Sequence, residues 1–232
     1  MFKQLYSALT SENSIDQAYA DLTRMLEHGA WMFARANEVL YSTVPAEEVR
    51  QPLYQRDGAV NELERSIRRK VLRHLTVNPG HDVAICLALM SVAKDAERIG
   101  DYCKNVFEVG AFYSEGFHVD RYQQPLDEMA ERLNGLFKEL IAATRDSGEA
   151  GAHRVITATR EIRGRCDKLI EALLSEEQTT EFHEAVAYSL LARHYKRVAS
   201  HLANIATAVT GRLEDLDFPS EADDRDRDGG PL

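Results

Sequence analysis

The sequence has little of what marks a secreted, disulfide-stabilised or membrane-spanning protein. Three cysteines, Cys86, Cys103 and Cys166, are an odd number without CxxC spacing in 232 residues. We therefore expect reduced cysteines in the core of a cytosolic protein, not a disulfide or zinc framework. The longest nearly apolar run, VAICLALMSVA, is shorter than the ~18 residues that cross a bilayer. The first residues also lack the apolar core of a signal peptide.

An excess of basic residues is also lacking. The chain has 28 Lys and Arg against 38 Asp and Glu, a net charge of −10. This balance disfavours a nucleic-acid partner, because binding to phosphates requires a basic face. About half of the net charge lies in DLDFPSEADDRDRDGGPL, residues 215–232, which we expect to be a disordered acidic tail. No GxSxG, Walker, GxGxxG or HExxH motif occurs, so we do not predict an enzyme.

Helical periodicity, by contrast, runs through almost the whole chain. No stretch alternates with period two, and no Asn-Gly or Asp-Gly turn joins two strand-like segments. The pattern predicts an all-α fold of six helices, with ranges of roughly 14–40, 55–76, 79–113, 120–145, 150–175 and 180–213. The break SEGFHVD divides them into two sets of three, so we expect one unit over residues 1–115 and a second over 116–214.

The third helix of each set supports an internal duplication. Residues 93–106, AKDAERIGDYCKNV, align with residues 192–205, ARHYKRVASHLANI, at an offset of 99 residues. Three positions are identical and three more are conservative; the identical pairs are Ala93/Ala192, Arg98/Arg197 and Asn105/Asn204. Together with the matching order of helices, this indicates a repeat.

Glu97 and Asp101 stand one turn apart on the third helix, opposite its apolar stripe of Ile85, Leu89, Val92, Ala96, Ile99, Cys103 and Val106. Their repulsion costs only a few tenths of a kcal/mol, so a solvated pair flanked by Lys94 and Lys104 is the simplest interpretation. A metal site is the alternative. The second helix carries Asp57 and Asn61 at the same spacing, and three carboxylates with an amide can converge on one cation.

These residues resemble a known signature. The stretch from Glu97 to Asn105, ERIGDYCKN, resembles the ERIGDHxxNI motif of the PhoU family of phosphate-uptake regulators, in which Arg98 also matches. The stretch from Asp57 to Glu64, DGAVNELE, resembles the D-x-x-I-[DN]-x-L-E segment of the same repeat. The resemblance covers roughly residues 15–213 and is more specific in the first half than in the second.

The resemblance implies two tandem three-helix bundles that regulate phosphate transport and phosphate signalling by docking. It implies acidic motifs that hold iron, zinc or another divalent metal, here through Asp57, Asn61, Glu97 and Asp101. It also implies a phosphate transporter as partner on its cytoplasmic side and, in some systems, a sensor histidine kinase; a homodimer stays open. We expect a cytoplasmic protein without a membrane span, located in part at the inner face of the membrane.

The second repeat departs from the motif. The positions of Asp57, Asn61, Glu97 and Asp101 correspond to Arg163, Asp167, Lys196 and Ser200. Two acids have become bases that offer no acceptor and repel a cation. We therefore expect at most one metal site, in the first repeat. In the second we expect either an ion pair of Asp167 with Lys196 or Arg163, or a surface that accepts an anion.

Histidines and aromatic residues give weaker signals. The Glu-x-x-His of a ferritin-like site occurs only at Glu115–His118, in the break between repeats, so such an oxidase is disfavoured. His194 and His201 could bind metal with Asp167, but partly buried, hydrogen-bonded histidines fit better. The aromatic residues Trp31, Phe33, Tyr41, Phe107, Phe112 and Tyr113 are either core or a docking patch.

Two other functions stay open at this stage. One is a metal-binding helical protein with a storage, delivery or catalytic role unrelated to transport. The other is a metal-free helical scaffold that keeps the bundle for association alone. Metal content and the nature of the partner discriminate among the three.

Overall fold

The computed structural model describes residues 13–113, 115–146, 148–175, 180–212 and 215–216. Six helices account for nearly all of them, and no strand occurs within these ranges. In chain order the helices are α2 (Asn13–Leu40), α3 (Ala46–Val77), α4 (Val83–Phe112), α5 (Asp120–Asp146), α6 (Glu149–Ser175) and α7 (Phe182–Val209). Most of the expected acidic tail, residues 217–232, lies outside the described part of the chain.

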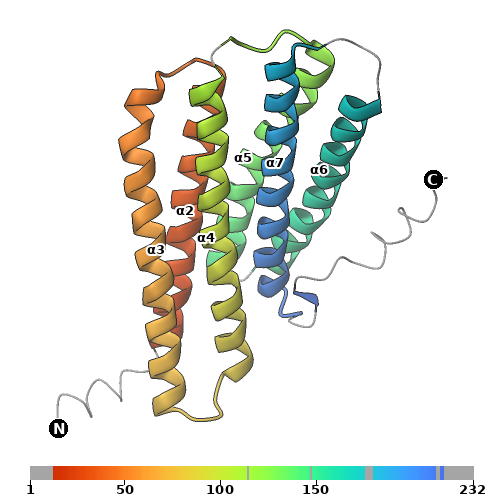
Figure 1. Cartoon of the computed structure of the whole chain (residues 1–232). Helices are drawn as coiled ribbons and strands as arrows, with labels where there is room; N and C mark the ends of the chain where they lie inside the picture. Colours follow the sequence, from red (N-terminus) through yellow and green to blue (C-terminus); the bar gives the residue numbers. More distant parts are fainter. Residues whose placement is uncertain (1–12, 114, 147, 176–179, 213–214, 217–232) are drawn as a thin grey trace.

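The helices form two antiparallel sets, α2–α4 and α5–α7, which lie side by side (Figure 1). The two sets meet where α4 packs against α7 and α2 packs against α5. The predicted all-α fold of two tandem three-helix bundles is confirmed. Among the described residues, no helix is long and apolar enough to cross a membrane.

Aromatic side chains join the two sets into one continuous core. Phe33 of α2 contacts Phe137 of α5 and Tyr195 of α7, with ring centroids 5.8 Å and 5.4 Å apart. All three are fully buried. At about 25 cal/mol per Å², burial of roughly 150–250 Å² of aromatic surface contributes on the order of 4–6 kcal/mol per ring. Separation of the repeats would expose this surface.

Helix α3 begins earlier than the periodicity predicts. The sequence predicted that this helix begins near residue 55, but it begins at Ala46 and contains Pro52. Proline in a helix forfeits one backbone hydrogen bond. Val49 and Leu53 flank Pro52 and are buried in the core, so their burial offsets that loss.

Helix α4 begins later than predicted, at Val83 instead of residue 79. Gly80, at φ +86°, and Asp82, at φ +54°, adopt left-handed backbone conformations in the turn before it. The Nε2 atom of His74 lies 3.0 Å from Asp82 Oδ2 and ties this turn to α3. Because the first turn of α4 lies at the end of the bundle, Ile85 is exposed, although we placed it on the buried stripe.

The three cysteines are free and buried, as predicted. Burial raises the pKa of Cys166 to about 12, and the nearby carboxylate of Asp167 adds to this rise, while Lys196 and Arg165 oppose it. Burial also raises the pKa of Cys86 and Cys103. A thiol in this environment stays protonated and unreactive at neutral pH.

Candidate functional site

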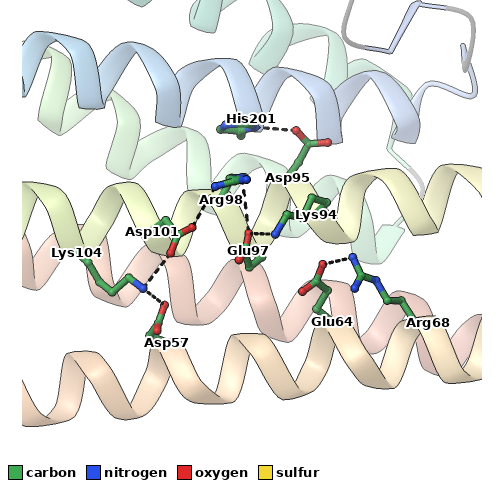
Figure 2. A network of polar contacts seen from close by, with 10 residues as sticks. All are labelled: Asp57, Glu64, Arg68, Lys94, Asp95, Glu97, Arg98, Asp101, Lys104 and His201. Carbon is green, nitrogen blue, oxygen red and sulfur yellow. Dashed lines mark hydrogen bonds and ion pairs between the residues drawn. The ribbon is translucent and has the colours of Figure 1, made fainter.

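The acidic residues that the sequence singled out lie at the seam between α3 and α4 (Figure 2). Asp57 and Glu64 belong to α3, and Glu97 and Asp101 belong to α4. The two helices are antiparallel neighbours, so side chains distant in sequence face each other across the seam. The expectation that the two helices bring these carboxylates close together holds for one pair, Asp57 and Asp101.

Lys104 of α4 bridges that pair. Its Nζ atom lies 2.9 Å from Asp57 Oδ1 and 2.9 Å from Asp101 Oδ1. Burial alone would lower the pKa of Lys104. Its hydrogen bonds to Asp101 and Asp57 and the charges of these residues raise the pKa by more, so the net shift is upward. The ammonium group therefore stays charged and compensates two acids on neighbouring helices.

Glu97 is compensated separately. Lys94 Nζ lies 2.7 Å from Glu97 Oε2, and Arg98 lies between the two acids of α4. Arg98 Nη1 is 3.5 Å from Asp101 Oδ2. Both acids of the one-turn pair therefore have basic neighbours, which removes the like-charge repulsion that the sequence raised.

The remaining motif residues lie apart from this bridge. Glu64 is buried and accepts a hydrogen bond of 2.6 Å from Arg68 Nη2. Asn61 is half-buried on α3, and Asn105 is half-buried near the end of α4. Within the part of the chain that the structure describes, no group of three or more His, Cys, Asp or Glu side chains is placed to hold a metal ion.

The residues as placed do not fit the metal that the resemblance implies. A metal would need the oxygens of Asp57 and Asp101 to converge on it, and the Lys104 ammonium lies between these oxygens. A cation in the same position would be repelled by that charge. Metal binding by Asp57, Asn61, Glu97 and Asp101 stays a prediction.

The second repeat carries an ion pair at the corresponding seam. Lys196 Nζ of α7 donates to both carboxylate oxygens of Asp167 of α6, at 2.5 Å and 2.6 Å. Ser200 donates instead to the backbone carbonyl of Lys196. Of the two arrangements that the sequence left open, this is the ion pair of Asp167 with Lys196. A lysine thus links two helices of each repeat.

Sequence reasoning missed a buried polar cluster between the repeats. Asp95 of α4 is buried, with its Oδ1 atom 2.7 Å from His201 Nδ1 and 2.9 Å from Asn204 Nδ2 of α7. An aspartate next to Lys94 in the sequence is expected at the surface. The one sequence feature that could have pointed to the cluster is the alignment of Asp95 with His194 at the repeat offset of 99 residues. This cluster attaches α4 to α7.

His194 and His201, the two histidines that the sequence singled out as alternative metal ligands, lie on α7 beside α4. His201 hydrogen-bonds to Asp95, and both His194 and His201 lie against the ring of Tyr102. Burial lowers the pKa of His194. His201 has the partly buried, hydrogen-bonded setting that we favoured over metal ligation, and His194 has a ring contact with Tyr102.

The fold and the site define a class: an all-helical protein of two three-helix repeats, in which a lysine ties two helices of each repeat through acidic side chains. The family model described as the PhoU domain matches residues 22–109 and again residues 126–209, one match in each repeat. The chain belongs to the PhoU domain family.

Curated relatives agree with this assignment. A phosphate-specific transport system accessory protein PhoU homolog of Xylella fastidiosa strain Temecula1 is 28% identical over 163 residues, covering 66% of this chain and 65% of that protein. The protein described in the same words from Caulobacter vibrioides strain NA1000 is 30% identical over 112 residues, covering 47% of this chain and 48% of the relative. The chain thus spans less than two thirds of the length of these relatives.

Solved structures share the fold. The crystal structure of PhoU from Pseudomonas aeruginosa is similar at a TM-score of 0.77 and 17% identity, covering 88% of this chain and 98% of that one. The phosphate transport system regulatory protein PhoU from Streptococcus pneumoniae is similar at a TM-score of 0.67 and 20% identity, covering 88% and 97%. At these identities the likeness concerns the fold.

Proposed function

We propose that the protein is an accessory regulator of a phosphate transport system and that it acts by association with the transporter, not by catalysis. The observation that carries this proposal is the pair of PhoU domain matches, one in each three-helix repeat. The relatives with this domain are described as accessory proteins of phosphate-specific transport. The transporter's cytoplasmic side is the expected place of contact, and a sensor histidine kinase is the second partner that the family resemblance implies.

A test in cells measures transport directly. Deletion of the gene should change phosphate uptake and raise transcription of the transporter genes in phosphate-rich medium, and the intact gene should restore both. Unchanged uptake and unchanged transcription after deletion would remove the proposed function. A homodimer is tested separately by light scattering of the purified protein.

For the seam between α3 and α4 we propose a metal-independent clamp. The supporting contact is Lys104, which supplies a permanent positive charge 2.9 Å from both Asp57 and Asp101. A lysine ammonium compensates carboxylates as a point charge without the oxygen cage that a metal requires. The regulator would then keep its bundle closed whatever the metal supply.

Plasma mass spectrometry tests the clamp against the metal site. The protein is purified without a metal-binding tag, beside the double variant Glu97→Ala/Asp101→Ala. We expect well below one equivalent of iron, zinc or another divalent metal in both proteins. One equivalent that is lost in the double variant would establish the metal site instead, and tight metal without any transporter partner would favour a storage or delivery protein.

A further inference from the structure

An apolar groove lies where the end of α4 meets the beginning of α7, at the end of the molecule that is uppermost in Figure 1. Its volume is about 630 Å³. The apolar lining comes from both repeats, with Val109 and Phe112 on α4 and Phe182, Val186 and Leu190 on α7. The groove therefore exists only because the two repeats pack together.

A buried carboxylate lies beside the groove, in the first turn of α7. Glu184 of α7 is 2% exposed and accepts hydrogen bonds from the backbone N–H of His118, at 2.5 Å, and from Tyr188 Oη, at 2.9 Å. Its position in the first turn of α7 is favourable for a negative charge. Phe117 stacks on Tyr188 with centroids 4.8 Å apart. The connection between the repeats is thus held against α7 beside the groove.

The rim exposes large apolar side chains. Phe112 is 82% exposed and Phe182 is 74% exposed. Val186 and Leu190 are also exposed, one and two turns further along α7. Phe112 thus differs in exposure from Phe107, which is fully buried, although the sequence did not distinguish the two. Clustered exposed aromatic and aliphatic residues of this kind mark an interaction surface.

The two carboxylates in the lining give the groove an acidic character. Its lining contains the carboxylates of Glu108 and Glu115 and, among the described residues, no lysine or arginine. The pKa of Tyr113 is raised, first by burial and then by the charges of Glu184, Glu115 and Glu181, which is the response expected in a negative potential. A cationic partner would be attracted here and an anionic one repelled.

The groove also adjoins the family signature. Asn105 and Glu108 line both this groove and a polar hollow formed with Arg98, Asp101 and Lys104. A segment bound along α4 would therefore contact the motif surface at one end and the apolar rim at the other. The signature would then contribute to docking as well as to the clamp.

We propose that this groove binds a lysine- and arginine-rich amphipathic helix that inserts large apolar side chains between Phe112 and Leu190. This inference rests on the proposed function in one respect: the cytoplasmic segments of membrane transporters carry an excess of lysine and arginine. The apolar face of such a helix matches the exposed apolar side chains, and its basic face matches Glu108 and Glu115. An anionic membrane surface would be repelled by these two carboxylates, and a second copy of a chain with net charge −10 would add like charge.

The experiment uses the full chain and a labelled helical peptide of about 18 residues, roughly five turns, with leucine on one face and lysine on the other. A matched peptide has glutamate in place of lysine. Fluorescence anisotropy gives Kd at about 50 mM and about 300 mM salt. A photoreactive residue on the apolar face of each peptide maps the contact by cross-linking.

We expect the basic peptide to bind and to cross-link near Phe112, Val186 and Leu190. Phe112→Ser/Leu190→Ser should raise Kd about tenfold or more, because both apolar anchors are lost. Glu108→Gln/Glu115→Gln should raise Kd less and reduce its salt dependence. All four residues are at least partly exposed, so the variants should keep the helical content of the parent.

The matched control is Leu72→Ser/Leu87→Ser, which removes two apolar residues, 69% and 62% exposed, in the same bundle but outside the groove lining. Its Kd should equal that of the parent protein. Equal weakening in the control, equal binding of the glutamate peptide, or cross-links confined to the acidic tail would overturn the proposal. So would sedimentation with anionic vesicles, or dimerisation, that depends on Phe112 and Leu190.

The two proposals fail separately. Unchanged phosphate uptake after gene deletion, with groove-dependent binding of the basic peptide intact, would remove the transporter as partner and keep the groove. Altered uptake that the Phe112→Ser/Leu190→Ser gene restores as well as the parent gene would keep the regulator and remove the groove.

Discussion

Tyr102 of α4 stacks on His201 of α7 with ring centroids 5.7 Å apart, and the two residues occupy the same position in the two repeats. The surrounding pairs follow the same correspondence. Asp95 corresponds to His194 and Asn105 corresponds to Asn204 at the repeat offset. The pair Asp95 and Asn204 is therefore equivalent to the pair His194 and Asn105. The first pair is hydrogen-bonded at 2.9 Å, whereas the second lines the groove. The duplicated helices thus cross at equivalent points and differ chemically on the two sides.

The contact between Asp95 and His201 should stabilise the packing of the repeats. His201→Ala leaves a buried carboxylate with one partner fewer, and we expect the free energy of unfolding to fall by about 1–3 kcal/mol. Urea denaturation followed by circular dichroism measures it. His153→Ala, at an exposed histidine, is the control and should change stability by less than about 0.5 kcal/mol. Equal effects of both variants would contradict a role for the buried pair.

Lys104 should contribute more to stability than its neighbour Lys94. Lys104→Met leaves Asp57 facing Asp101 without the bridging cation and leaves Asp101 with Arg98 alone, so we expect a loss of about 2 kcal/mol. Lys94→Met removes a pair on one helix that is more exposed to solvent, and should cost less than about 1 kcal/mol. Thermal denaturation compares the two.

A triple variant tests whether charge causes the loss of stability in Lys104→Met. Adding Asp57→Asn and Asp101→Asn to Lys104→Met should recover most of the lost stability, because the unpaired charges are gone. A triple variant as unstable as Lys104→Met would show that packing of the lysine side chain, not charge, sets the loss.

Gly110 allows α2 and α4 to approach closely. A Cβ atom there would lie 2.7 Å from Leu40 Cα and 2.8 Å from Leu40 N, both backbone atoms that cannot move away cheaply. We expect Gly110→Ala to destabilise the protein by about 1–3 kcal/mol. Gly164→Ala meets nothing within 4 Å in the middle of α6 and should stabilise by about 0.5–1 kcal/mol. Opposite signs in one denaturation series would establish the close contact.

Asp21 should give stability that depends on acid pH. Burial alone would raise the pKa of Asp21. Hydrogen bonds from Lys70, Ser66 and Arg24 lower the pKa by more, so it lies below the ordinary value of 3.8. A carboxylate with a lowered pKa in the folded state stabilises the protein at pH values above its unfolded pKa. That stabilisation is lost as pH falls through the folded pKa.

The test compares Asp21→Asn with the parent protein by urea denaturation between about pH 5 and about pH 2. The variant should be less stable at pH 5, and the difference should shrink toward pH 2. Glu62→Gln is the control, because Glu62 pairs with Arg65 at the surface. A difference that stays constant with pH would place the effect of Asp21 in packing.

The helices, their number among the described residues and the duplication could be predicted from the amino-acid sequence. These follow from local periodicity, because burial of one face every 3.6 residues is written into neighbours along the chain. Leu89, Val92 and Ile99 were placed on the apolar stripe of α4 by that rule, and they are buried. The boundaries were less accurate where Pro52 entered α3 and where Pro79 and Gly80 formed a turn before α4.

The polar contacts between different helices could not be predicted in this way and depend on how the helices pack. In the sequence, Lys104 is recognisable only as a neighbour of Asp101 on the same helix. Its ion pair with Asp57 depends on the rotation and register of α3 against α4. Asp95 likewise meets His201 only where α4 packs on α7. Helix spacing along the chain specifies which residues share a face, but the packing of separate helices sets which faces meet. That is why the acids were found from the sequence and their partners from the fold.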